Sequence, residues 1–517
     1  MSGRSFLYGT AVLLAANVFN RFVGFIYQIM MMRLIRPEGV GLFSMIFPVY
    51  IMMLVLASLG IPVAISKLVA EEVAVGNLSG AYRIFKISLS IIIASSSLLM
   101  VLLLLCAPLL TRHVFANPDV YPCFVSLVPG VLIVSICSAF RGFFQGLQRM
   151  SPTAVTQAIE QLVRVAAGLG IASIMLPHGI KYASLGISLG VICGELSGFL
   201  IMLYIYATRR PRLYASAFDP TPTSNVLGRI FNLGIPVTLT RFVSTALMSL
   251  DALIIPRRLL LSGMSMWEST AAFGKFVGIT EALFFTPGVI TLALTTALIP
   301  AVSDAMAQGK TMLLKNRIEE AVRITIMVGA PVAAVFLVLP HEMCQVFFGY
   351  ASAGDALFVL ALSGPFLYLH QTTTGILQGL GRAVVPFKNL VKASVFKITG
   401  IYFLTSIPGF GIQGTALSLA VGYIILACLN YRDLKKHTGI SINAVSCAYK
   451  PVIAAAAAGM VMLQTKLALA GFFDAPGLPG LALTLAAGAI SYLGALLFTG
   501  GINAADLSRI SHIIKRS

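Results

Sequence analysis

The chain has 517 residues, of which 58% are hydrophobic and only 10% charged, and its mean hydropathy is +0.93. Soluble domains carry about a quarter charged residues, so this composition excludes a soluble enzyme. A formal charge of +18 would suggest nucleic acid in a soluble protein, but cytoplasmic loops of membrane proteins collect Lys and Arg. The chain is therefore predicted to be an all-α polytopic membrane protein with no nucleic-acid partner.

Apolar runs long enough to cross ~30 Å of hydrocarbon recur along the whole chain. The first run is too long for the core of a secretory signal peptide and is expected to be a spanning helix. In chain order the fourteen predicted spans are 6–32, 40–66, 87–110, 121–140, 153–176, 182–207, 229–256, 272–302, 324–340, 357–376, 389–407, 412–431, 451–470 and 479–499.

Basic residues are distributed unevenly between the two sides of the membrane that these spans define. Most of the 36 lysines and arginines lie at the N-terminus, in the loops after even-numbered spans, and at the C-terminus. Since basic loops stay in the cytoplasm, both termini are predicted to be cytoplasmic in the cell membrane.

An internal repeat relates the two halves of the chain. The segment FRGFFQGLQRMSP at 140–152 matches TTGILQGLGRAVVP at 373–386, with Gln145 and Gln378 lying 233 positions apart. An offset of six spans preserves orientation, as in transporters built from parallel repeats. The predicted fold is two six-helix bundles, 1–212 and 213–440, followed by 441–517 with two further helices and a cytoplasmic tail.

Ionisable residues inside apolar spans are costly and are candidates for function by default. Glu160 and Arg164 lie four positions apart and share a helix face, either as an internal ion pair or, with Gln157, as a face lining water. Glu195 lies beside glycines spaced every fourth residue from Gly186 to Gly198, which predicts close helix packing. The other candidates within spans are Asp251, Lys275, Glu281 and Lys397.

Arg21 and Arg241 occur in matching settings, each within the letters RFV on the first span of one half. Neither has an acidic residue three or four positions away, so its counter-charge must come from another helix or from a ligand. A planar guanidinium suits bidentate binding of phosphate oxygens. The two residues are predicted to bind a phosphate-bearing substrate, the alternative being structural pairing with Glu160, Glu195 or Asp251.

Several other classes of site lack support. The seven cysteines show no paired metal spacing and predict no disulfide framework. The segment SDAMAQGKT at 303–311 ends like a phosphate-binding loop, but Asp304 stands where the first glycine is required, so no nucleotide site is expected. No cofactor is predicted, although an unidentified coupling ion stays open.

The chain resembles the stage V sporulation protein B family, in the polysaccharide-exporter branch of the multidrug/oligosaccharidyl-lipid/polysaccharide (MOP) exporter superfamily. The similarity rests on these segments: NVFNRFVGF in the first span, RPEGVGLFSMIFPVY, GIPVAISKLVAEEVAVGN, RGFFQGLQRMSPTAVTQAIEQLVRV and LDALIIPRRL. It implies a flippase for a lipid-linked, anionic cell-wall precursor such as lipid II, acting in spore cortex synthesis. More distantly, the arginine before the Gly-Phe of lipid II flippases matches Arg21, whereas Tyr27 and Gln28 depart from their pattern.

Three alternatives to a flippase make different demands on the sequence. A cation-coupled multidrug exporter on the same fold would use the carboxylates of Glu160, Glu195, Asp251 and Glu281. A membrane-embedded glycosyltransferase would need a large loop with paired carboxylates, and the sequence has none. A non-transporting scaffold is the third. The flippase is expected to be a monomer whose partners are the lipid-linked glycan and membrane lipids, and not to be an enzyme.

Overall fold

The computed structural model describes residues 3–209, 223–440, 445–469 and 477–501. They form helices and turns, with no strand among them, which confirms the predicted all-α class. Apolar side chains cover most faces of these segments, and in lipid the backbone must satisfy its polar groups within each helix.

Contacts between residues divide the chain into two units, Met1–Gly278 (unit 1) and Ile279–Ser517 (unit 2). The predicted boundary between 212 and 213 lies outside the described residues, and the predicted domains remain a prediction. The helices of unit 1 are α1 (Gly3–Ser58), α2 (Ile61–Ala74), α3 (Leu78–His113), α4 (Tyr121–Gly146), α5 (Ser151–Met175), α6 (Ile180–Arg209), α7 (Thr223–Leu261) and α8 (Met266–Lys275), with short 3-10 turns at Pro118–Val120 and Leu176–His178.

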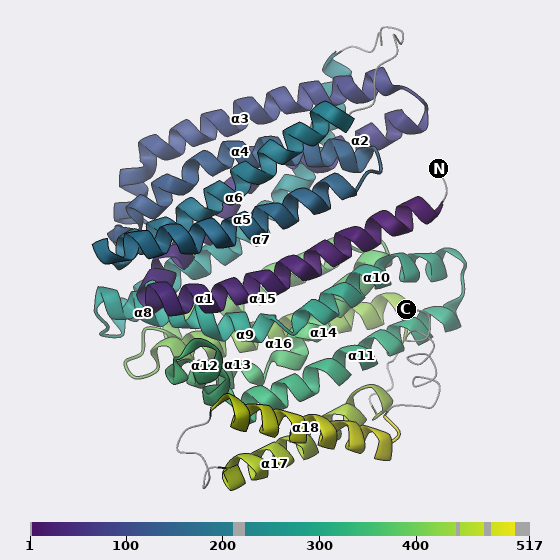
Figure 1. Ribbon diagram of the computed structural model, residues 1–517. Coiled ribbons are helices and arrows are strands. Elements are labelled where there is room, and N and C mark those ends of the chain that lie inside the picture. The colour runs from purple at the N-terminus through teal and green to yellow at the C-terminus, as the bar shows by residue number, and fades with distance from the viewer. Residues whose placement is uncertain (1–2, 210–222, 441–444, 470–476, 502–517) are drawn as a thin grey trace. The chain divides into compact units, whose positions relative to one another are not determined.

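A π-helical turn, η3 (Phe276–Glu281), passes from unit 1 into unit 2. The remaining helices are α9 (Ala282–Phe285), α10 (Gly288–Ala307), α11 (Thr311–Val338), α12 (Pro340–Phe348), α13 (Gly354–Ala361), α14 (Gly364–Gly379), α15 (Val384–Leu404), α16 (Gly411–Thr438), α17 (Lys450–Leu469) and α18 (Leu478–Phe498), with a 3-10 turn at Ala351–Ala353 and a π turn at Val445–Tyr449. Within unit 2, α17 and α18 pack against each other and α17 packs against α11 (Figure 1).

The described residues contain eleven helices that are long and apolar enough to cross a membrane, or twelve if the pair 351–361 and 364–379, bent by 56°, is one span. This number counts α1 once, although its 56 residues would extend about 84 Å. Arg36, with φ of 59°, interrupts α1, so α1 consists of two helices joined at a kink. The prediction of fourteen spans requires these two helices to be separate spans and α15, which carries three lysines, to be a further one.

Three predicted spans differ from the observed helices. The span 40–66 ends at Ser58, and α2 follows after Gly60. The span 272–302 is divided among α8, η3, α9 and α10, with Pro287 before α10. The span 357–376 bends between α13 and α14. Hydropathy does not report these interruptions, because apolar residues continue through each of them.

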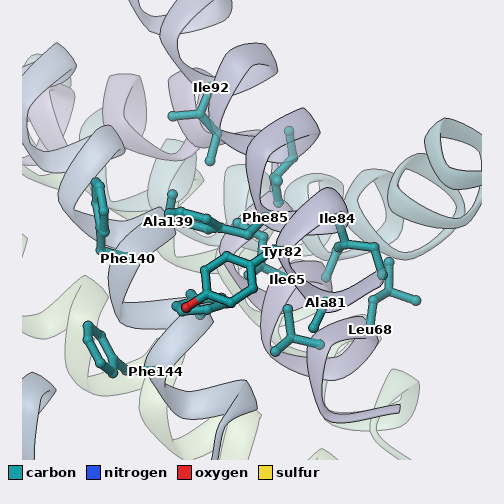
Figure 2. Packing of buried hydrophobic residues seen from close by; sticks show 14 of the residues in the cluster. Ile65, Leu68, Ala81, Tyr82, Ile84, Phe85, Ile92, Ala139, Phe140 and Phe144 are labelled. Atoms are coloured by element: carbon teal, nitrogen blue, oxygen red, sulfur yellow. The ribbon is translucent and has the colours of Figure 1, made fainter. Parts of the chain in front are cut away.

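An aromatic core joins α2, α3, α4, α6 and α7 in unit 1. Phe85 lies between Phe143 and Phe140, with ring centroids 4.6 Å and 5.2 Å away. Figure 2 shows Tyr82, Phe85, Phe140 and Phe144 among the aliphatic side chains of this cluster. This cluster fixes the position of α4. Arg141, which follows Phe140 on α4, belongs to the site described below.

Candidate functional site

Three residues on the apolar helices of unit 1 form a cluster of charged side chains. Glu160 on α5 accepts from Arg141 Nη2 on α4 at 2.8 Å and from Arg164 Nη2 on α5 at 2.5 Å. The three side chains are 17%, 17% and 20% exposed for Glu160, Arg141 and Arg164. We call this group the Arg141–Glu160–Arg164 triad.

Close packing of α6 on α5 positions the triad. A Cβ on Gly194 would lie 2.8 Å from the Cβ of Arg164, and one on Gly190 would lie 2.2 Å from the Cα of Gly168. A Cβ on Gly198 would lie 3.3 Å from Oε2 of Glu160. The glycine ladder therefore allows the close approach that the sequence predicted, and Glu160 and Arg164 are confirmed as a pair on one helix face.

Glu195 on α6 is held by a different partner. Tyr50 Oη on α1 donates to Glu195 Oε2 at 2.7 Å, and the two residues are 3% and 6% exposed. Gly130 on α4 faces both, because a Cβ there would meet Tyr50 Oη at 2.4 Å and Glu195 Oε2 at 2.7 Å. Glu195 is thus enclosed by α1, α4 and α6.

Arg21 lies on the part of α1 that packs along α5. A Cβ on Gly24 would lie 3.7 Å from Gln161 Nε2, and one on Gly168 would lie 2.5 Å from Tyr27 Oη. Because residue numbers rise together along these contacts, α1 and α5 run in the same direction. Arg21 therefore lies at the level of Gln157, which is one turn before Gln161 on α5. Arg21 is exposed, and its side chain forms no ion pair with any described residue.

Arg241 on α7 is exposed as well, and its guanidinium likewise has no ion pair within the described parts of the chain. Glu160 and Glu195, two of the structural counter-charges that the sequence left open, are engaged by Arg141, Arg164 and Tyr50. Whether Arg21 and Arg241 bind a substrate stays a prediction.

The other predicted site residues are half-buried and divided between the units. Gln157 on α5 and Asp251 on α7 belong to unit 1, whereas Glu281 at the end of η3 and Lys397 on α15 belong to unit 2. The stem of Lys397 packs on α16, where a Cβ on Gly422 would lie 3.1 Å from the Cβ of Lys397.

Arg141 was missed as a site residue, because the sequence placed it among the basic residues flanking a span. It lies inside α4, five residues before the helix ends at Gly146. The signal was in the internal repeat, since Thr374 occupies the matching position of the second copy. A basic residue that one copy lacks points to a role specific to the other copy.

The described residues contain no group of three or more His, Cys, Asp or Glu side chains that could hold a metal ion. A coupling ion therefore stays a prediction without an assigned site.

Comparison with known proteins places these features in a family. Residues 6–306 match the polysaccharide biosynthesis protein family, and residues 275–403 match the MatE family. Stage V sporulation protein B of Bacillus subtilis is 30% identical over 448 residues, covering 86% of each chain. Lipid II flippase MurJ of Bacillus subtilis is 25% identical over 461 residues, covering 84% of this chain and 83% of the relative.

Among solved structures, the inward closed conformation of lipid II flippase MurJ superposes with a TM-score of 0.70 at 14% identity, covering 94% of this chain and 98% of the other. The likeness confirms an all-α polytopic fold. The family match over residues 6–306, together with the 30% identical relative, shows that the chain belongs to the polysaccharide biosynthesis protein family.

Proposed function

We propose that this protein is a flippase that moves a lipid-linked, anionic cell-wall precursor across the cytoplasmic membrane by alternating access. Lipid II is the proposed substrate, and its supply for spore cortex peptidoglycan synthesis is the proposed role, since the relatives are a stage V sporulation protein and a lipid II flippase. Four arginines on apolar helices of unit 1 support the proposal most directly. Arg21 and Arg241 are exposed without an ion pair among the described residues, and Arg141 and Arg164 share one carboxylate.

The physical chemistry of the substrate suits this set of arginines. A sugar diphosphate cannot cross hydrocarbon unaided, and arginine forks bind phosphate oxygens bidentately. A negative-inside potential contributes about 2.3 kcal/mol per net charge per 100 mV toward outward movement of an anion. We propose that the protein acts without nucleotide, cofactor or chemical conversion of its substrate, as a monomer with both termini in the cytoplasm.

Arginine substitutions test the proposal. Arg21→Ala and Arg241→Ala are expected to leave membrane insertion intact and to abolish flipping, because the head group loses its cationic contacts. Flipping of lipid II is measured in cells depleted of other flippases. Arg112→Ala is the matched control, since Arg112 is exposed at the end of α3. Wild-type flipping by both variants would remove Arg21 and Arg241 from the site.

Reporter fusions test the orientation separately. A reporter active only outside the cytoplasm is expected to be active after Pro177 and silent after Arg210, a position outside the described residues. The opposite pattern would place both termini outside the cytoplasm and reverse the proposed topology.

A cation-coupled multidrug exporter is the second candidate. The MatE match over residues 275–403 favours it, and the carboxylates of Glu195, Asp251 and Glu281 could couple cations. Resistance to amphipathic cationic drugs on expression, without complementation of a flippase-depleted strain, would support this function over the first.

A further inference from the structure

The donors of the triad converge on a single carboxylate. Arg141 on α4 donates to Oε2 of Glu160, and Arg164 on α5 donates to Oε1. Each carboxylate oxygen therefore accepts a hydrogen bond from a different guanidinium group. Two donor groups that meet at the two oxygens of one carboxylate are also spaced to meet two oxygens of one phosphate group.

The two arginines of the triad have N–H donors that Glu160 does not use. Nε of Arg141 and Nε of Arg164 are buried and have no hydrogen-bond partner within the described residues. With Glu160 ionised, two guanidinium groups and one carboxylate leave one net positive charge. An anion with more oxygens and more charge than a carboxylate would satisfy this cluster better than Glu160 does.

We infer that Glu160 is an exchangeable counter-ion. It occupies Arg141 and Arg164 in the absence of substrate, a phosphate group of the substrate displaces it, and it displaces that phosphate on release. This inference rests on the proposed function and assigns Arg141 to substrate binding. No bond is made or broken in the exchange, because only ion pairs change partners.

The energetics of buried charge give a reason for such an exchange. Two arginines without a counter-ion inside an apolar helix bundle would be costly, and removing one partner of a buried pair is strongly destabilising. A carboxylate fixed on the protein avoids this state before binding and after release. It also competes with the substrate for the same donors, which limits affinity and speeds dissociation.

The neighbouring carboxylate is not free to replace Glu160. Glu195 accepts from Tyr50 at 2.7 Å and faces Gly130 on α4. Gly198 lies beside Oε2 of Glu160 and has no side chain that could compete with Arg141 for this oxygen. The exchange is therefore assigned to Glu160 alone.

Binding of farnesyl diphosphate to the purified full-length protein tests the inference, with farnesol as the uncharged probe. Glu160→Gln removes the competing charge and is expected to lower the dissociation constant for farnesyl diphosphate about tenfold. Arg141→Gln and Arg164→Gln are expected to raise it about tenfold or more. In flipping assays, Glu160→Gln is expected to lower the maximal rate several-fold, because release becomes slow.

Glu72→Gln is the matched control. Glu72 also pairs with an arginine, Arg229, at 2.8 Å, and its side chain is 14% exposed, so the variant removes a similar ion pair away from the triad. It is expected to leave farnesyl diphosphate affinity unchanged. If Glu160→Gln does not fold, Glu160→Asp keeps a charge on a shorter stem and is expected to tighten binding by a smaller factor.

Unchanged or weaker binding in both Glu160 variants, with arginine variants that still lose affinity, would overturn the exchange and leave the flippase proposal standing. The expected binding changes in a protein that does not flip lipid II would overturn the proposed substrate and leave the exchange standing. Equal binding of farnesol and farnesyl diphosphate to the wild type would overturn the exchange as well.

Discussion

Gly142 on α4 lies against the carbonyl oxygen of Pro62, since a Cβ there would be 2.5 Å away, and Gly375 on α14 lies against that of Thr295 at 3.1 Å. One turn later, Gly146 faces the Cβ of Val69 at 2.7 Å and Gly379 that of Val302 at 2.9 Å. Members of each matched pair are 233 positions apart. Units 1 and 2 thus repeat the same helix contacts through the same small residues.

Two of the three positions that correspond to the triad differ in charge between the units, and the third is basic in both. At the same offset of 233, Thr374 corresponds to Arg141, Ala393 to Glu160 and Lys397 to Arg164. Unit 2 instead has a cluster in which Asn389 donates to Asn430 at 3.1 Å and to Asp433 at 2.8 Å.

Asn430 donates in turn to Thr374 at 3.1 Å. The helix contacts of the repeat are therefore separable from its chemistry. Small residues fix the backbone in both units, whereas the carboxylate that lies between two arginines in unit 1 is an alanine at the matching position of unit 2.

The largest expected loss of stability comes from replacing Glu160 of unit 1 with alanine, the residue that unit 2 has at the matching position 393. Glu160→Ala leaves Arg141 and Arg164 without a counter-ion and is expected to lower the free energy of unfolding by about 3 kcal/mol. Thermal unfolding in detergent measures the loss. The double variant Arg141→Thr/Glu160→Ala removes one of the uncompensated charges and is expected to recover part of it.

Asn389→Ala is the counterpart in unit 2 and breaks neutral or singly charged hydrogen bonds, with an expected loss of about 1–2 kcal/mol. If Glu160→Ala proves no less stable than Asn389→Ala, the difference in charge between the two clusters has no energetic consequence.

The glycines test the shared part of the comparison. Gly142→Ala and Gly375→Ala each force a Cβ into a contact of 2.5 Å or less, with Pro62 O and with Thr295 Cγ2. Overpacking of this kind costs about 1–3 kcal/mol, and similar losses in melting temperature are expected for the two variants. Gly170→Ala is the control, because nothing lies within 4 Å of its Cβ position. A loss in only one of the two would show that the units do not share this contact.

The smallest expected loss of stability comes from an exposed ion pair, and it tests whether burial or the number of ion pairs governs the loss. Arg229 on α7 pairs with Glu71 at 3.1 Å and with Glu72 on α2, the reverse of the triad in composition. Glu71 and Arg229 are 47% and 43% exposed, so Glu71→Gln is expected to cost about 0.2–1 kcal/mol and less at high salt. A loss as large as that of Glu160→Ala would show that burial does not govern these pairs.

Much of the fold and one pair of the site followed from local patterns. Apolar run lengths gave the spans, a spacing of four joined Glu160 to Arg164, and the glycines from Gly186 to Gly198 indicated close packing. The unpaired state of Arg21 within its own helix was also readable, because intrahelical partners must lie three or four positions away.

The sequence by itself therefore determined the properties of single helices, namely the length of each helix and which residues share one of its faces. The regular rise and turn of an α-helix fix these two properties. Only the tertiary structure decided that Arg141 completes the triad from another helix, that Tyr50 takes Glu195, and that α1 breaks at Arg36. These depend on how closely two helices approach, which small residues permit but no single helix specifies.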